Sequence, residues 1–165
     1  AEGVTGRFAD YDYLHTSNHL LKEIASKGYY SNSFHVPVDV SISSYEKIAL
    51  ESEFHSVCNG GCITYVEFSE MPASNTEAIL DMVDYAFEKG CNYFGINFPL
   101  DNCTTCGHIS RIGEACPRCG GHYIKRLRRV SGYLAESDRC TPGKYKEMLQ
   151  RIGHDRINSY SSEEL

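Results

Sequence analysis

The sequence predicts an α/β fold with a small metal-binding segment attached to it. Between Cys62 and Leu100 the pattern runs strand, helix, strand, which is the order of a sheet covered by helices. After Leu100 the composition changes abruptly to a stretch rich in cysteine, glycine and basic residues. The chain of 165 residues is 41% hydrophobic and 23% charged, close to globular averages, so we expect it to fold around one main core.

Charge and hydropathy exclude several classes of protein. The formal net charge is −6, which gives no global basic field for binding nucleic acid. No apolar run approaches the ~20 residues that cross a bilayer, and residues 1–13 lack the features of a signal peptide. Four of the eight cysteines lie in two CxxC pairs, which favours metal thiolates in a reducing compartment over secreted disulfides. We therefore expect a cytoplasmic protein without a membrane partner.

The first sixty residues contain signals for two helices and one strand. A short helix is predicted between an N-cap at Ser17 or Asn18 and a stop at Gly28. Residues 29–38 are β-prone and contain a proline near their end, which predicts a strand. A capping box at residues 43–46 predicts a second helix over the sequence KIALES.

The middle of the chain holds the strongest α/β signals. Residues 62–68 are dense in β-branched and aromatic side chains and follow an Asn-Gly-Gly turn, so they are predicted to form a strand. A second capping box, at residues 74–77, predicts a helix that ends at Gly90. Residues 92–100 predict another short strand. The apolar stripe of the helix consists of Ile79, Met82, Val83, Ala86 and Phe87.

A short terminal helix is predicted near the end of the chain. It begins after Thr141 and has Pro142 at the first helical position, where proline is favoured. The polar ending, residues 159–165, is expected to fray. The apolar face of the helix consists of Tyr145, Met148, Leu149 and Ile152.

The most specific motif in the chain is a set of four cysteines. Cys103, Cys106, Cys116 and Cys119 form two CxxC turns that nine residues separate. Two such turns let four thiolates converge on one ion in the tetrahedral geometry that zinc prefers. Each turn is followed by a glycine, which relaxes its backbone. Because four thiolates close the coordination shell, we predict a structural zinc ion and not a catalytic one.

Two alternatives for the four cysteines stay open in the sequence. They could be free or disulfide-bonded thiols, although the paired turns make this the less common case. The same four thiolates also suit an iron or iron–sulfur centre. His108 and His122 lie beside the cluster but are surplus to a shell already closed by four thiolates. We interpret these two histidines as bystanders.

A series of motifs gives the chain a family resemblance. Residues 128–134 have the sequence RRVSGYL, and the stretches NSFHVP, CNGGCITYVE and GINFPLDNCTTCG precede it in that order. SDR and PGK follow near the end. Together these stretches resemble the C-terminal part of anaerobic ribonucleotide reductases, the class III glycyl-radical enzymes. The resemblance spans nearly the whole chain. It implies the C-terminal part of a glycyl-radical-enzyme α/β barrel, with a small four-cysteine zinc-ribbon-like appendage and a glycyl radical loop.

The resemblance implies that Gly132 carries a stable glycyl radical. A Cα radical is delocalised over the flanking amide groups and needs a planar centre, which a side chain would crowd. By itself an SGY tripeptide is usually a turn, so only its context singles out Gly132. In the family an activating enzyme that uses S-adenosylmethionine and an iron–sulfur cluster removes the hydrogen atom. The glycyl radical then generates a cysteine thiyl radical that reduces ribonucleotides to deoxyribonucleotides, with formate or a thiol system as the reductant.

The chain departs from the family in its length. Members run to several hundred residues and carry the thiyl cysteine upstream of the glycine, so the resemblance implies a larger N-terminal reductase chain as partner. This chain is then a fragment or a separate C-terminal subunit, and we favour the subunit. A lone piece of a barrel leaves sheet edges and an apolar face unpaired, which predicts association. Cys58 and Cys62 are the remaining candidates for redox thiols, with buried structural cysteines as the alternative.

A local basic cluster supports a competing hypothesis. Lys125, Arg126, Arg128 and Arg129 follow the second CxxC pair, and zinc ribbons with such patches often bind nucleic acid through its phosphates. Solvated or salt-bridged charges are the more common interpretation of four basic residues. The acidic α/β pattern of the preceding hundred residues favours the enzyme. A purely structural interaction module is a third hypothesis.

The sequence thus predicts three parts of the chain. Residues 1–100 are expected to form the barrel segment, and residues 101–126 form a zinc-binding segment that we call the four-cysteine segment. Residues 127–165 are expected to hold the glycyl radical loop and the C-terminal helix.

Overall fold

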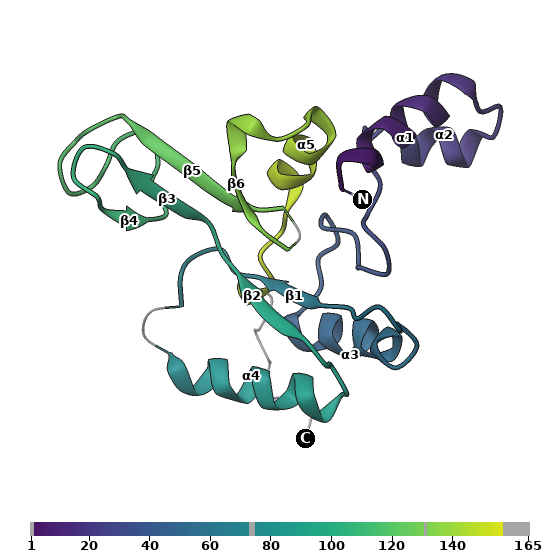
Figure 1. The fold of residues 1–165 in the computed structure, drawn as a ribbon, viewed down its shortest axis with the longest axis horizontal. Helices are drawn as coiled ribbons and strands as arrows, with labels where there is room; N and C mark the ends of the chain where they lie inside the picture. The colour runs from purple at the N-terminus through teal and green to yellow at the C-terminus, as the bar shows by residue number, and fades with distance from the viewer. Residues whose placement is uncertain (1, 73–74, 131, 157–165) are drawn as a thin grey trace. The chain divides into compact units, whose positions relative to one another are not determined.

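The chain divides into two compact units in the computed structural model, which describes residues 2–72, 75–130 and 132–156 (Figure 1). Unit 1 combines the N-terminal residues up to Val38 with residues 99–151. Unit 2 combines residues 39–98 with the described residues from Ile152 onward. Within the described part, no helix has both the length and the apolar character that crossing a membrane requires.

Unit 2 confirms the predicted strand–helix–strand order. Its two strands pair in parallel, from Thr64 opposite Phe94 to Glu67 opposite Asn97. A helix connects them, as parallel pairing requires, and runs beside the pair in Figure 1. The elements of unit 2 are α3 (Ser44–His55), β1 (Thr64–Glu67), α4 (Thr76–Glu88), β2 (Phe94–Asn97) and the 3₁₀ turn η2 (His154–Arg156).

The core of unit 2 lies where α3 and α4 meet the parallel strands. Its buried members are Ile48, Val66, Met82, Ala86 and Cys91. The predicted apolar stripe of α4 is only partly buried, because Met82 and Ala86 face the core while Phe87 is 58% exposed. Part of the apolar surface of α4 therefore faces solvent in the described chain.

Helix caps form largely where the sequence predicts them. The Ser43 side chain accepts a hydrogen bond from the Glu46 amide at 3.2 Å, and the Glu46 carboxylate accepts one from the Ser43 amide at 3.0 Å. The predicted capping box is therefore confirmed. Asn18 caps α2 (His19–Ala25) by accepting from Leu21. The predicted capping residue Ser74 lies outside the described residues, and Asn75 caps α4.

One prediction for the N-terminal region is wrong. The predicted strand at residues 29–38 is a loop, in which the His35 amide donates to the Asn32 carbonyl at 3.1 Å and Ser33 adopts a left-handed φ of 51°. None of the described strands pairs with this segment, and the Tyr30 hydroxyl instead donates to the Asp12 carboxylate at 2.7 Å. Conversely, α1 (Glu2–His15) lacks apolar periodicity and was not predicted. It packs against α2 and against α5 (Pro142–Gln150), and it buries Ala9 completely.

Unit 1 contains a four-stranded antiparallel sheet in the order β4-β3-β5-β6. The predicted terminal helix is confirmed with Pro142 in its first turn, although Ile152 lies beyond its end. Neither this sheet nor the parallel strand pair of unit 2 closes into a barrel. The structure therefore supports the predicted mixed α/β class but not the predicted barrel. The further elements of unit 1 are β3 (Leu100–Cys103), β4 (Ile109–Ser110), β5 (Ile124–Arg129), β6 (Leu134–Glu136), the 3₁₀ turn η1 (Ser137–Arg139) and α5 (Pro142–Gln150).

Candidate metal centre and glycine hairpin

The four predicted cysteine ligands come together in space. Their sulfur atoms all lie within 4.8 Å of one another. The Sγ atoms of Cys103 and Cys119 are 3.6 Å apart, and those of Cys106 and Cys116 are 3.7 Å apart. A tetrahedral zinc ion with bonds of about 2.3 Å places its sulfur ligands roughly 3.8 Å apart, whereas a disulfide needs about 2 Å. The geometry therefore fits one tetrahedral metal ion and excludes disulfides within the cluster.

The two CxxC turns share one backbone conformation. In the first turn the Gly107 amide donates to the Cys103 carbonyl at 2.8 Å, and in the second the Gly120 amide donates to the Cys116 carbonyl at the same distance. Both glycines have a positive φ, 71° and 70°, which side chains disfavour. The predicted role of the glycines after each pair is therefore confirmed, and each turn aims its two sulfurs at the same point.

The electrostatics of the cluster favour a bound cation. Burial raises the pKa of the Cys103 thiol, but hydrogen bonds from the backbone amides of Cys106 and Thr105 outweigh it and lower the value to about 6. At Cys119 a hydrogen bond from the Gly121 amide lowers the pKa, yet the neighbouring thiols and burial raise it to about 12. One thiolate thus forms readily, while further thiolates beside it need a positive ion to offset their repulsion.

The two neighbouring histidines have partners outside the cluster. His108 Nε2 lies 3.0 Å from the Ser110 hydroxyl, and His122 Nδ1 donates to the Glu114 carbonyl at 3.0 Å. Neither histidine belongs to the group of potential metal ligands in the described chain. Their arrangement agrees with their interpretation as bystanders.

A buried carboxylate links the cysteine loops to the sheet. Asp101 lies on β3 and is fully buried. It accepts from Arg128 Nη1 at 2.7 Å and from Arg126 Nη1 at 3.2 Å. The Ile112 amide also donates to it, at 2.9 Å. Buried carboxylates need such donors, and here the donors come from β5 and from the loop between the CxxC turns. Sequence reasoning missed this role of Asp101, because its partners are 11 to 27 residues away.

The basic cluster after the second CxxC pair is engaged within the chain. Arg126 donates to the carbonyls of Ile112 and Gly113, at 2.7 Å each, in addition to its pairing with Asp101. The Lys125 ammonium lies 2.8 Å from the Glu136 carboxylate. These contacts confine the cationic groups to structural ion pairs, which leaves fewer of them for phosphate binding.

Gly132 lies at the tip of the β5–β6 hairpin. The strands pair up to Arg129 opposite Leu134, and the Val130 amide donates to the Tyr133 carbonyl at 2.8 Å. Gly132 is exposed, and, apart from the glycine itself and its two chain neighbours, no atom of the described chain lies within 4 Å of the place where a Cβ would be. Local sterics therefore do not explain a glycine at this position.

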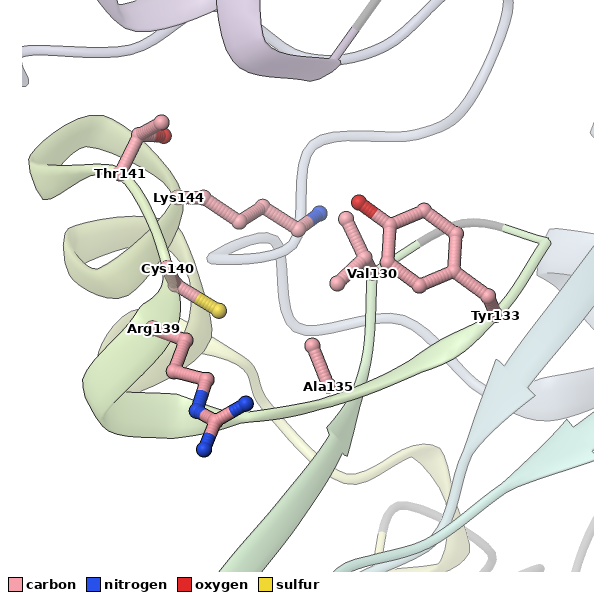
Figure 2. Close-up of a pocket in the computed structure, with 7 residues that line it drawn as sticks. All are labelled: Val130, Tyr133, Ala135, Arg139, Cys140, Thr141 and Lys144. Atoms are coloured by element: carbon pink, nitrogen blue, oxygen red, sulfur yellow. The ribbon is translucent and has the colours of Figure 1, made fainter.

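A small cavity of about 100 Å³ opens beside the hairpin (Figure 2). Figure 2 shows the side chains of Cys140 and Lys144 projecting from the α5 side toward Val130 and Tyr133. Lys144 is buried and forms an ion pair with Glu147. Sequence reasoning missed the cavity, because its walls meet only in the folded unit. The lining residues are Val130, Tyr133, Ala135, Arg139, Cys140, Thr141 and Lys144.

The two candidate redox thiols lie in unit 2, in the turn before β1. Cys58 and Cys62 are both half-buried. Burial, a hydrogen bond with Cys58 and the Cys58 charge raise the pKa of the Cys62 thiol to about 11. The structure therefore places these two thiols close to each other in one turn of unit 2.

Unit 2 also contains a buried polar cluster that the sequence did not reveal. His154 Nδ1 accepts a hydrogen bond from the Glu67 amide at 2.8 Å, at the carboxyl end of β1. The side chains of Asn97 and Glu67 are hydrogen-bonded where the two strands end. Beside them, Lys47 and Glu51 form a buried ion pair on α3. The cluster fastens the segment after α5 to the parallel strands.

Several solved structures that resemble this chain are anaerobic ribonucleotide reductases. One of them has a TM-score of 0.73 at 23% identity, over 93% of this chain and 23% of that structure's chain, which establishes the shared fold. The Thermotoga maritima enzyme with glycerol in its active site has a TM-score of 0.61 at 26% identity, over 82% of this chain and 20% of its own. These likenesses establish the fold, and the four cysteines add a cluster that could hold one metal ion.

Sequence comparison identifies the family. Residues 1–154 match the profile of the anaerobic ribonucleoside-triphosphate reductase family. The chain belongs to this family. It is 35% identical over 164 residues to the reductase of that name from Enterobacteria phage T4, covering 93% of this chain and 26% of that protein. For the Escherichia coli K12 reductase the identity is 36%, over 93% of this chain and 22% of the relative. The chain thus spans about a quarter of the length of these relatives.

Proposed function

We propose that this chain is the glycyl-radical-bearing C-terminal part or subunit of an anaerobic ribonucleoside-triphosphate reductase. The family membership supports the reaction class, which is reduction of ribonucleotides to deoxyribonucleotides. The thiyl cysteine and most of the substrate site then belong to a larger N-terminal chain. Together with that chain, the parallel strands of unit 2 contribute to an α/β barrel. The predicted division at residues 1–100, 101–126 and 127–165 is part of this proposal.

Gly132 is the residue we propose to carry the radical. The supporting observation is its place at an exposed hairpin tip, where an added Cβ would meet nothing. Packing within the chain does not require glycine at this position, so we attribute the glycine to its chemistry. Removal of one Cα hydrogen leaves a planar radical centre that is delocalised over the two flanking amides. Exposure also lets an activating enzyme reach the Cα–H bond. That partner is proposed to be a radical enzyme using S-adenosylmethionine and an iron–sulfur cluster.

Cys103, Cys106, Cys116 and Cys119 are proposed to hold a structural zinc ion. Four sulfur donors leave no position for water or substrate, so the ion would hold the loops in place. The four-cysteine segment lies between β3 and β5, and β5 leads directly into the Gly132 hairpin. Metal binding therefore fixes the strand that presents the glycine.

The alternative, a zinc-ribbon nucleic-acid-binding protein, has weaker support. Arg126 and Arg128 share the buried Asp101 carboxylate, and Lys125 pairs with Glu136. These ion pairs engage the positively charged side chains that would have to contact the phosphates of a nucleic acid. The family membership also accounts for the hairpin, which the alternative leaves without a role.

Oxygen cleavage tests the proposed radical site. The full chain is incubated with the upstream reductase chain, the activating enzyme and S-adenosylmethionine without oxygen, and is then exposed to air. A glycyl radical reacts with oxygen and breaks the backbone at its own residue, so mass spectrometry should find a truncation at Gly132. Gly113→Ala serves as the matched control, because Gly113 also has free space around its Cβ position. The Gly113→Ala chain should be cleaved as the wild-type chain is, whereas the Gly132→Ala chain should stay intact. Cleavage of the Gly132→Ala chain to the same extent would overturn the assignment.

A further inference from the structure

Four cysteines lie outside the metal cluster, and two of them share one turn. Cys58 and Cys62 flank the exposed sequence Asn59-Gly60-Gly61 directly before β1. The Gly61 amide donates to the Cys58 carbonyl at 3.0 Å, which closes the turn and brings its two ends together. Gly61 has a φ of 82°, a conformation that favours glycine. The turn is thus built to reverse the chain between two thiols.

The two thiols lie close enough for Cys58 to influence the ionisation of Cys62. A hydrogen bond with the Cys58 side chain and the charge of Cys58 are among the causes that raise the pKa of Cys62, after burial. Cys91 lies behind them and is almost fully buried, at 2% exposure, so reagents in solution do not reach it readily. Cys58 and Cys62 are both half-buried and therefore within reach of such reagents.

Cys140 provides a comparison within the same chain. It is also half-buried, and burial raises its pKa. The charged groups that act on it are Lys144, Arg151, Asp138 and Glu147, none of which is a thiol. Exposure alone is thus common to three cysteines, while a neighbouring thiol in an exposed turn distinguishes Cys58 and Cys62.

We propose that Cys58 and Cys62 form a reversible dithiol–disulfide couple that exchanges with an external disulfide or dithiol. In the oxidising direction the Cys58 thiolate attacks one sulfur of the external disulfide and displaces the first thiolate. The Cys62 thiolate then attacks the Cys58 sulfur and displaces the second. Two electrons pass from the pair to the external disulfide. The protons of the two thiols end on the two released thiols, and an external dithiol reverses the sequence.

The coupling between the thiols sets the order of these steps. Cys62 is the poorer first nucleophile, because its thiolate forms only at high pH. Part of that elevation comes from the hydrogen bond with Cys58 and from its charge. Both are lost when Cys58 enters a mixed disulfide, so the pKa of Cys62 falls when its thiolate is needed. The couple does not involve Gly132 or the metal cluster.

Mass mapping after exchange tests the couple. The full chain, purified without oxygen, is incubated with glutathione disulfide, alkylated and cut with trypsin. No lysine or arginine lies between Ile48 and Glu88, so both cysteines stay on one peptide while Cys91 falls on the next. That peptide should lose about 2 Da and resist alkylation, and dithiothreitol should restore it. Cys58→Ser should lose this internal bond, whereas Cys140→Ser should keep it.

Three outcomes would overturn the couple. They are a peptide that carries only glutathione adducts, a bond between Cys62 and Cys91, and full alkylation of both thiols under conditions that modify Cys140. The Gly132→Ala chain should behave as the wild type does. The experiment therefore tests the dithiol–disulfide couple independently of the proposed radical function.

Discussion

The four-cysteine segment and unit 2 bury their side chains in different ways. The four-cysteine segment encloses a cluster of only Cys103, Ile112 and Cys116, two of which are proposed metal ligands. Unit 2 instead packs apolar side chains from two helices and a strand pair around Ile48 and Val66, with a buried polar cluster beside them. The first region therefore depends on its ion and on one buried carboxylate, and the second on packing between distant elements.

Metal removal should produce the largest difference in stability between the four-cysteine segment and unit 2. A Cys103→Ser/Cys119→Ser variant, or the wild type after chelation, loses the ion that replaces an apolar core. Structural zinc contributes about 10–16 kcal/mol in small zinc domains, so the segment should unfold. Hydrogen exchange should show lost protection at the amides of Gly107 and Gly120 and unchanged protection on β1 and β2. Elemental analysis should find one zinc per wild-type chain. Iron in its place, or equal loss of protection in both regions, would contradict the comparison.

The next largest effect should follow from neutralising Asp101. Asp101→Asn removes the negative charge that faces Arg126 and Arg128, and leaves two cationic groups beside a neutral amide. Loss of one partner from a buried ion pair typically costs about 3 kcal/mol or more. Urea unfolding of the metal-loaded chain should therefore show this loss of stability. Asp138→Asn, at an exposed position, should be close to neutral. Equal stability of the two variants would show that the Asp101 cluster is not structural.

A smaller, pH-dependent effect should appear in unit 2. Burial and then the Lys47 charge lower the pKa of His154 to about 4, although the charges of Glu67, Glu51 and Asp155 oppose the shift. The unfolded chain has the ordinary value of about 6.5, so His154 contributes stability above pH ~6.5 that is lost as the pH falls towards 4. The full contribution is about 3 kcal/mol.

His154→Asn provides the control for this pH dependence. The asparagine Oδ1 can accept the same hydrogen bond from the Glu67 amide but does not titrate. The difference in unfolding free energy between wild type and variant should shrink as the pH falls from 6.5 to 4. A constant difference would mean that His154 does not titrate in this range. Taking the difference also removes the contribution of the thiolates, which both chains share.

Local signals in the sequence predicted the elements whose causes are local. The capping box at Ser43, the strand–helix–strand order and the two CxxC turns each depend on residues a few positions apart. The segment at residues 29–38 shows the limit of such signals, because none of the described strands pairs with it despite its β propensity. Helix α1 shows the opposite case, since tertiary contacts hold a sequence without apolar periodicity.

Long-range contacts also account for the parts of the site that the sequence did not reveal. Gly6 and Gly143 allow α1 to approach α5, because a Cβ on Gly143 would lie 2.7 Å from the Gly6 Cα. The Asp101 carboxylate, the cavity beside the hairpin and the His154 cluster likewise join residues far apart in the chain. Family resemblance singled out Gly132, and the fold then placed it at an exposed tip. Periodicity and spacing would have predicted only a turn there.

Electron paramagnetic resonance of the activated chain tests the central claim most directly. With the upstream reductase chain, the activating enzyme and S-adenosylmethionine under anaerobic conditions, we predict a doublet, because one hydrogen remains on the radical Cα. The doublet should collapse to a single line when the glycines carry deuterium at Cα. It should be absent in Gly132→Ala and present in Gly113→Ala. A doublet of wild-type size in Gly132→Ala would contradict the assignment of the radical to Gly132.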